Sequence, residues 1–578
     1  MTMALHGLGV SRGVSLGVAH IAQRHHLDIA QRTIQEDQIE NEVQRFRGAV
    51  FGARTELRET RNRIPRSTPA EILEFIDAHV LMLEDGTLTE PPIQLIRELA
   101  CNAEWALEVQ RNRLAAVFDD MDDPYIASRM DDVDQVVARI QRQLATPTAS
   151  SDGERSDYDG IVLIADDIAP ADLTLLHHEG LAGLITEFGG PLSHTAILAR
   201  SLKIPAAMGV RHARQLFREG EAVIVDGERG IVMADAPKTV QTYYRKRARA
   251  FRAQQRDLIK LRSKPAQTRC GTRIRLDANI DLVDDLKDVR QGGADGIGLY
   301  RTEYLFLNRA DPPSEDEQFE TYAEVIAAMG GAPVTIRTID VGADKPLQGR
   351  GPRSGVPINP AMGLRAIRLC LQDLNLFRPQ LRAIVRAAAV GPVRMLVPML
   401  STPQELFQVR NLLKATLRDL KRDGFAVPDH VPLGGMIEVP AAAIAATTFA
   451  KYLDFLSIGT NDLIQYTLAI DRIDDQVSHL YDPVHPAILK LIQGVFDAGL
   501  RSGTEVTMCG EMAGDPQYTR LLLGLGLRSF SMHPGHLLEV KQAVTETDID
   551  ALKDHTRRLM RASNPLRIGA ILREMNEL

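Results

Sequence analysis

Cysteine is scarce in this chain of 578 residues, and long apolar runs and an excess of basic residues are absent. The four cysteines, Cys101, Cys270, Cys370 and Cys509, lie far apart and form no CxxC pair. This spacing argues against a zinc site and against a disulfide framework. Free thiols are typical of a reducing compartment, so we expect a cytoplasmic protein.

The sequence lacks the usual features of a membrane protein and of a nucleic-acid-binding protein. No apolar run reaches the roughly 18 residues that crossing a bilayer needs, and the N-terminus lacks the pattern of a signal peptide. The formal net charge of −8 disfavours broad nucleic-acid binding. The chain has 44% hydrophobic and 25% charged residues, which is typical of a globular protein, and its length allows about two to four domains.

The first 237 residues change character twice. Residues 8–22 are rich in glycine and valine, which predicts short strands joined by turns. Glycine then becomes scarce and apolar residues recur at helical spacing, which predicts a bundle of antiparallel helices. Strand patterns such as IVLIA at 161–165 then return. We therefore expect an α/β domain, residues 1–30 with 146–237, into which a helical subdomain, residues 31–145, is inserted.

The second half of the chain has a regular rhythm. Residues 238–265 predict a charged linker helix with little apolar surface to bury. Over residues 266–578, eight strand patterns alternate with helical stretches, which is what a (β/α)8 TIM barrel requires. The strand patterns are RIRLDAN, GADGIGLYRTE, VTIRTID, VRMLVPML, GGMIEVP, DFLSIGTND, EVTMCGE and RSFSM.

Polar residues gather at the predicted C-terminal ends of these strands, where barrel active sites lie. Purely structural polar residues would be scattered over both ends, so the clustering favours a catalytic barrel. Several arginines indicate a small and highly anionic ligand, because guanidinium groups bind phosphate and carboxylate in a bidentate way. The polar residues are Arg301, Glu303, Arg337, Asp340, Glu438, Asn461, Asp462 and Cys509, with Arg365 or Arg472 as a further arginine.

Two acids and a thiol extend this chemistry. Glu438 and Asp462 follow neighbouring strands about 5 Å apart, so both carboxylates can hold one cation, and Mg²⁺ prefers such ligands together with substrate phosphate. A structural salt bridge is the alternative for either acid alone. Cys509 can donate a proton, because a thiol with a pKa of about 8.5 is mostly protonated at neutral pH, although a buried inert cysteine is more usual.

The segment GGPLSHTAILAR, residues 189–200, places His194 at the predicted start of a helix. Free N–H groups at a helix N-terminus favour phosphate, and a neutral imidazole nitrogen is a good nucleophile. Taken alone, a histidine in this position is more often a capping or surface residue. We expect that ordinary role for His177 and His178.

The chain is similar to the family of phosphoenolpyruvate (PEP)-utilising enzymes. GGPLSHTAILAR resembles their phosphohistidine signature, and DFLSIGTNDLIQYTLAIDR, residues 454–472, resembles their second signature. GLYRTEYLF, RTIDVGADK, NPAMGLRAIR, MIEVPAAA and MCGEMAGD match in the same order. Over essentially the whole chain, the order of domains resembles the Enzyme I family, the phosphoenolpyruvate–protein phosphotransferases of the bacterial sugar phosphotransferase system.

The resemblance implies a role for each matching residue. It implies transfer of the PEP phosphoryl group to His194 and then to a histidine of the carrier protein HPr, with a homodimer formed through the barrel. His194 must then swing between the barrel and the carrier. The implied residues are Arg301, Arg337, Arg365, Lys345, Asn461, Asp462 and Arg472 for the substrate, Glu438 and Asp462 for Mg²⁺, and Cys509 as the donor of a proton to the enolate.

An acidic stretch and the absence of a P-loop pattern bear on which molecule accepts the phosphoryl group from His194. Between Arg66 and Arg97 the chain has no lysine or arginine but six acids. This is either a solvated helix face or a docking surface for a carrier with a basic rim, where complementary charge would speed encounter. The chain has no P-loop pattern, which argues against a synthase that uses nucleotides.

Two residues depart from the family pattern near the histidine. Leu192 stands where the signature has Thr, Ser or Asn, and Ala169 stands where Enzyme I typically has Thr. Each change removes a hydroxyl, and one hydrogen bond to a charged group is worth about 1.5–3 kcal/mol. A regulator that senses PEP and pyruvate is therefore the alternative function. A nitrogen-related paralogue of Enzyme I would differ only in its acceptor.

Overall fold

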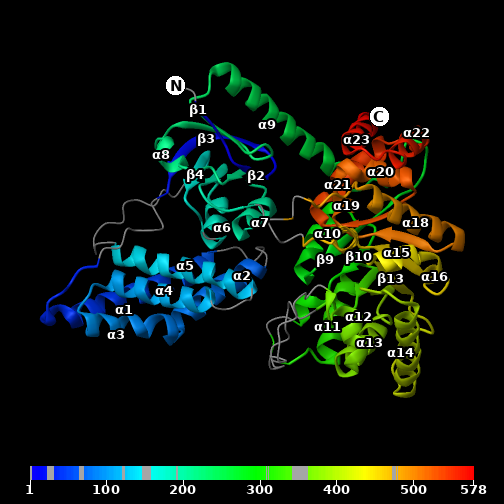
Figure 1. The fold of residues 1–578 in the computed structure, drawn as a ribbon, viewed down its shortest axis with the longest axis horizontal. Helices are drawn as coiled ribbons and strands as arrows, with labels where there is room; N and C mark the ends of the chain where they lie inside the picture. Colours follow the sequence, from blue (N-terminus) through cyan, green and yellow to red (C-terminus); the bar gives the residue numbers. More distant parts are fainter. Residues whose placement is uncertain are drawn as a thin grey trace. The chain divides into compact units, whose positions relative to one another are not determined.

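The computed structural model describes the chain in two compact units, Met1–Gln254 and Gln255–Leu578, each of which is described by itself (Figure 1). The described residues are all except 1–2, 23–30, 64–69, 120–123, 146–157, 169, 191–192, 307–308, 310, 342–361, 472–476 and 478–479.

The first unit contains an eight-stranded sheet of order β1-β8-β7-β3-β4-β5-β6-β2. Strands β3, β4, β5 and β6 are parallel, and β7, β8 and β1 continue the sheet antiparallel on one side. The N-terminal strands therefore share one sheet with strands that follow the helical region. The strands are β1 (Met3–His6), β2 (Leu8–Ser11), β3 (Val14–Ile21), β4 (Ile161–Ala165), β5 (Gly183–Thr186), β6 (Ala206–Met208), β7 (Ala222–Asp226) and β8 (Ile231–Ala234).

Both faces of this sheet are covered, because successive side chains of a strand point to opposite faces. Ile161 and Leu163 of β4 pack in one core with α6, α7 and the helical bundle, whereas Val162 and Ile164 pack in a second core with α8. These short helices are α6 (Pro170–His178), α7 (His194–Ser201) and α8 (Ala213–Leu216).

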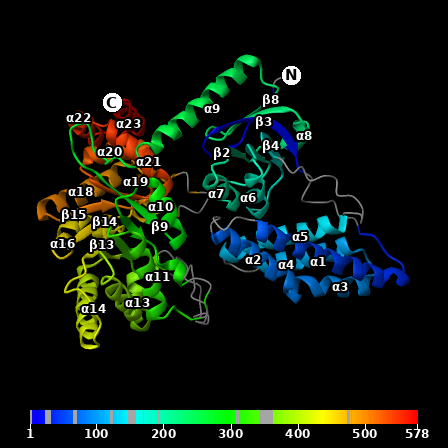
Figure 2. The same cartoon turned by 180° about the vertical axis from the view of Figure 1, so that it is seen from behind.

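The inserted region forms the predicted bundle, whose helices lie side by side in Figure 2. Its core contains the fully buried side chains of Phe46, Leu57 and Leu107. Arg139 of α5 is buried and pairs with Glu56 of α1 and, at 2.9 Å, with Asp172 of α6, so an ion network ties the bundle to the sheet domain. The helices are η1 (Glu36–Gln38), α1 (Ile39–Arg63), α2 (Ala70–Glu84), α3 (Gly86–Leu99), α4 (Ala103–Asp119) and α5 (Pro124–Ala145).

The long helix α9 (Lys238–Ile259) corrects one expectation. The sequence predicted little apolar surface, but Tyr244 and Ala248 are buried against Val14 and Ile224 of the sheet. Residues four apart lie on the same helix face, so two apolar side chains are enough to make a buried stripe on a helix that is otherwise charged. Arg247 strengthens this contact by pairing with the buried carboxylate of Asp226.

The second unit is a closed barrel of parallel strands, which confirms all eight predicted strands. The strands are β9 (Arg275–Ile280), β10 (Ile297–Tyr300), β11 (Val334–Arg337), β12 (Val393–Val397), β13 (Leu433–Ile437), β14 (Phe455–Ile458), β15 (Glu505–Met508) and β16 (Ser529–Met532). Around them lie η2 (Val283–Asp285), α10 (Leu286–Gly292), η3 (Glu303–Leu305), α11 (Glu315–Ala328), α12 (Ala366–Gln372), α13 (Leu374–Ala387), α14 (Pro403–Arg422), α15 (Pro440–Ile444), α16 (Ala446–Ala450), α17 (Thr460–Leu468), α18 (Pro486–Ser502), α19 (Glu511–Gly514), α20 (Pro516–Leu525), η6 (Pro534–His536), α21 (Leu537–Glu546), α22 (Ile549–Met560) and α23 (Pro565–Glu577).

The barrel helices are well terminated. Ser314 and Thr402 begin α11 and α14 with capping boxes, in which the hydroxyl accepts a backbone N–H and a glutamate three residues later reaches back. Among the helices within the described residues, none combines the length and apolar character that crossing a bilayer needs.

Candidate active site

Three carboxylates meet at the C-terminal ends of the barrel strands. Glu438 directly follows β13, Asp462 lies in the first turn of α17 after the adjacent β14, and Asp340 lies three residues beyond β11. One oxygen from each side chain lies within 4.8 Å of the others. The sequence predicted Glu438 and Asp462 as a pair, and the structure adds Asp340 to them.

The three acids differ in how far neighbouring arginines compensate their negative charge. Asp340 lies 2.9 Å from Nη2 of Arg365 and 3.4 Å from Nη1 of Arg337. In the part of the chain that the structure describes, no ion pair joins Glu438 or Asp462 to a lysine or arginine. Burial raises the pKa of Glu438, and the carboxylates of Asp462 and Asp340 raise it further. Like charges gathered around a buried carboxylate favour a bound cation, and oxygen donors fit a hard divalent ion.

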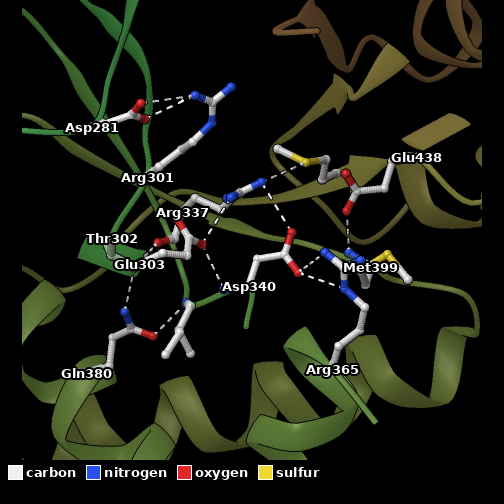
Figure 3. A network of polar contacts seen from close by, with 12 residues as sticks. Asp281, Arg301, Thr302, Glu303, Arg337, Asp340, Arg365, Gln380, Met399 and Glu438 are labelled. Atoms are coloured by element: carbon white, nitrogen blue, oxygen red, sulfur yellow. Dashed lines mark hydrogen bonds and ion pairs between the residues drawn. The ribbon is translucent and has the colours of Figure 1, made fainter. Parts of the chain in front are cut away.

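The backbone also holds Glu438. The N–H of Met399 donates to Glu438 Oε1 at 2.6 Å (Figure 3). Met399 has a φ of 59°, a left-handed conformation that is uncommon outside glycine. This strained residue, two positions beyond β12, fixes one oxygen of the carboxylate and leaves the other for a ligand.

Arg337 is the buried cation of the site. Its Nη2 donates to Glu303 Oε1 at 3.0 Å, and Glu303 Oε1 also accepts the N–H of Asp340 at 2.8 Å. Burial opposes the charged form of Arg337, yet the carboxylates of Glu303 and Asp340 raise its pKa above the ordinary value. Its buried Nε has no hydrogen-bond partner among the described residues. A buried donor without a partner on a charged group is suited to an oxygen of an anionic ligand.

A glutamine that the sequence gave no reason to single out supports this segment from behind. Gln380 of α13 is fully buried; its Oε1 accepts the N–H of Ile339, and its Nε2 donates to Thr302 Oγ1, both at 3.0 Å. Thr302 in turn donates to the carbonyl of Arg337 at 3.0 Å. Figure 3 shows that Gln380 and Glu303 hold the segment from Arg337 to Asp340 between them. Gln380 lies in a helix interior, away from the polar strand ends on which the sequence analysis relied.

The other predicted anion-binding residues lie in different surroundings. Arg365, the N-cap residue of α12, lies against Asp340, and its Nη1 is 3.4 Å from the hydroxyl of Tyr466. Arg301 pairs with Asp281 at 3.0 Å and remains partly exposed, and Figure 3 shows its guanidinium turned toward Asp281 and away from Asp340. Lys345 and Arg472 lie outside the described residues.

Asn461 is held by the neighbouring strand end. Its Nδ2 donates to Glu511 Oε1 at 3.0 Å, and its Oδ1 accepts the N–H of Glu511 at 2.9 Å. The nitrogen and the oxygen of the Asn461 amide therefore both bond to Glu511 at the start of α19, and Asn461 directly precedes Asp462 in the chain. The predicted substrate-binding amide lies at the C-terminal end of the barrel, as the sequence placed it.

Cys509 is buried directly after β15. The hydroxyl of Ser457 donates to its Sγ at 3.2 Å, and the amide of Asn279 donates to its backbone carbonyl at 3.0 Å. Burial raises the pKa of the Cys509 thiol, against the opposing effect of the Ser457 hydrogen bond. The thiol therefore stays protonated at neutral pH, which is the state that a proton donor requires.

His194 is the first residue of α7, in agreement with the predicted helix start. Ser193 caps the helix by accepting the N–H of Ala196 at 3.2 Å, and Thr195 donates to the carbonyl of Ile168 at 2.9 Å. These two bonds fix the start of the helix on the sheet domain. Leu192 and Ala169, the departures from the family pattern, lie outside the described residues.

Comparison with known proteins identifies the family. Three models of PEP-utilising enzymes match the chain: the N-terminal region at residues 6–129, the mobile domain at 158–230 and the PEP-binding domain at 255–549. The phosphoenolpyruvate-protein phosphotransferase of Cupriavidus necator is 45% identical, and the alignment covers 100% of both chains. Proteins of the same name from Staphylococcus carnosus and Bacillus subtilis are 37% and 36% identical over 99% of each chain. This chain therefore belongs to the family of PEP-utilising enzymes, as its motifs predicted.

Proposed function

We propose that this protein transfers the phosphoryl group of PEP to its own His194 and then to a histidine of an HPr-like carrier protein, releasing pyruvate. This is the first step of a phosphotransferase system. The observation that carries the proposal is the cluster of acids and arginines at the C-terminal ends of the barrel strands. It occurs in a chain that aligns end to end with relatives named phosphoenolpyruvate-protein phosphotransferase.

The arginines bind the two anionic groups of PEP. Arg337 supplies a buried donor, Nε, that has no partner among the described residues. Arg301 exchanges the partly exposed carboxylate of Asp281 for the ligand, since an ion pair that solvent reaches contributes only about 0–1 kcal/mol. The family resemblance adds Arg365, Lys345, Asn461 and Arg472 to the same binding site.

Glu438 and Asp462 hold Mg²⁺, because their charges are not balanced by an ion pair among the described residues. Asp340 lies beside them, but two arginines already compensate its charge. When bound, Mg²⁺ neutralises charge on the phosphoryl oxygens and on the developing enolate.

The chemistry is a displacement at phosphorus followed by a proton transfer. The bond between phosphorus and the enol oxygen breaks, a bond between phosphorus and an imidazole nitrogen of His194 forms, and the enolate of pyruvate remains. The S–H bond of Cys509 then breaks as a C–H bond forms at C3 of the enolate, which gives pyruvate. His194 belongs to the first unit and Cys509 to the second, so the histidine domain has to move between the barrel and the carrier.

The carrier docks on the helical bundle. The acids of α2 and α3 attract a basic rim, although two of them are partly neutralised within the bundle. Asp77 lies 3.1 Å from Arg61, and Glu84 lies 2.6 Å from Arg58. Glu90 of α3 is exposed and lies outside both of these pairs, so it contributes to the docking charge. Homodimerisation through the barrel and a cytoplasmic location stay predictions, which sedimentation velocity and cell fractionation test.

Labelling with radioactive PEP tests the proposal. We expect acid-labile, base-stable phosphate on the wild-type protein with Mg²⁺, none on His194→Ala, and normal labelling of His6→Ala, an exposed histidine on β1. Added HPr should then remove the label from the wild type.

Two other results would redirect the proposal. Label that persists on His194→Ala would move the phosphohistidine elsewhere. PEP binding without any label would favour a regulator that senses PEP and pyruvate, and would give Leu192 and Ala169 the decisive role.

A further inference from the structure

A buried serine contacts the sulfur of Cys509. Ser457 lies on β14 and is fully buried, and its Oγ is 3.2 Å from Cys509 Sγ at the end of the adjacent β15. The two strands pair in register, with Ser457 opposite Thr507. Within the described residues, this bond to sulfur is the only hydrogen bond of the Ser457 hydroxyl. The hydroxyl hydrogen is therefore committed to the sulfur.

The thiol hydrogen of Cys509, by contrast, is held weakly. In the part of the chain that the structure describes, the other hydrogen-bond contact of the sulfur is the carbonyl of Ile458, at 3.8 Å. That carbonyl already accepts the backbone N–H of Cys509 at 3.1 Å. A long bond to an occupied acceptor leaves the S–H free to turn toward a substrate atom, whereas the sulfur lone pair is fixed by Ser457.

We propose that Ser457 is a positioning residue for proton transfer by Cys509: it orients the thiol and stabilises the thiolate that remains. The inference rests on the proposed function, in which Cys509 protonates the enolate. As the S–H bond breaks and the C–H bond forms, the S–H electron pair stays on sulfur. The hydroxyl of Ser457 then donates to a charged acceptor, and such a bond is about twice as strong as a neutral one. The thiolate later recovers its proton from water.

Burial makes this contribution necessary. Cys509 is shielded from solvent, so water does not stabilise a thiolate there. Glu438 opposes the negative sulfur and Arg337 and Arg301 favour it, but only through space. The ordinary alternative is a core serine whose hydroxyl is merely satisfied by the nearest acceptor. That alternative predicts a change of stability without a selective change of proton transfer.

The test measures C3 proton transfer separately from binding. The full-length protein with Mg²⁺ is incubated with pyruvate in D₂O, and exchange of the methyl hydrogens is followed by NMR. For Ser457→Ala we expect exchange and kcat to fall by about 10- to 100-fold, the effect of one hydrogen bond to a charged group. The dissociation constant of PEP should stay within about twofold, because Ser457 contacts none of the arginines in the described structure.

Two further variants make the outcomes distinct. Ser529→Ala removes a buried barrel hydroxyl that has no hydrogen-bond partner among the described residues, so it reports the general effect of the substitution. Cys509→Ala should abolish exchange. If Cys509→Ala exchanges at the wild-type rate, the proton donor of the proposed function is wrong. If Cys509→Ala is inactive but Ser457→Ala matches Ser529→Ala, the inference about Ser457 alone is overturned.

Discussion

At the scale of single residues, neighbouring acids at the barrel mouth play different parts because of the cations beside them. Asp340 is neutralised by Arg365 and Arg337, whereas Glu438 and Asp462 have no ion-pair partner among the described residues. Glu303 also contacts Arg337, but it serves the fold by accepting the N–H of Asp340 as well. The same side-chain chemistry is therefore structural at Glu303 and available for a metal at Glu438.

Replacing Glu438 with glutamine tests this distinction. The amide oxygen of Glu438→Gln can still accept the N–H of Met399, so the fold is retained while the charge is lost. We expect Mg²⁺ affinity to fall by at least about 10- to 100-fold, since removal of an outer-shell partner alone costs that much. Titration calorimetry measures the affinity, with Glu320→Gln on the exposed face of α11 as the control. Unchanged affinity would place the metal elsewhere.

At the scale of elements, capping and loop contacts hold the strand ends in place. The segment after β11 carries Arg337 and Asp340, and it is fixed by Glu303 on one side and by Thr302 and Gln380 on the other. Helix α14 follows the strained residue Met399, and Thr402 begins it with a hydroxyl that accepts the N–H of Glu405 at 3.3 Å.

The cap of α14 gives a prediction about stability. Thr402→Ala removes the capping hydroxyl, which should lower the free energy of unfolding of the barrel by about 1 kcal/mol. Thr402→Ser keeps the hydroxyl and should cost less. Urea unfolding followed by circular dichroism measures both. Equal losses for the two variants would mean that the methyl group of Thr402, and not its cap, carries the effect.

At the scale of the whole molecule, the chain consists of two compact units with separate cores and different tasks. The first unit carries His194, and the second carries the acids, arginines and Cys509. Helix α9 begins in the first unit and ends in the second. Because the cores are separate, binding in one unit need not stabilise the other.

Calorimetry of the full chain should therefore show two unfolding transitions. We expect PEP with Mg²⁺ to raise the melting temperature of the barrel transition only, with about 2.7 kcal/mol of stabilisation at a concentration 100 times the dissociation constant. Glu438→Gln should abolish the shift, whereas His194→Ala should retain it. A single transition that shifts as a whole would show instead that the units unfold together.

Much of this protein can be read from local patterns. The eight barrel strands follow from buried apolar runs bounded by turn residues, and the helix start at His194 follows from the segment GGPLSHTAILAR. The parallel topology in turn brings the residues at the ends of β11, β13 and β14 to one end of the barrel. The sequence therefore determined the fold class, the family and the end of the barrel at which the chemistry lies.

Only the tertiary structure decided which partners these residues have. Gln380 and Ser457 act through neighbours 41 and 52 residues away in the chain, and no local pattern marks such contacts. The buried face of α9 is similar, because Tyr244 and Ala248 become a packing surface only when the sheet lies against them. The electrostatics of the acids also depend on neighbours in space. Asp340 and Glu438 are both acids that follow a barrel strand, but burial and the distance to an arginine decide whether the charge of each is compensated. Secondary structure depends on neighbours along the chain, whereas the chemistry of a side chain depends on neighbours in space.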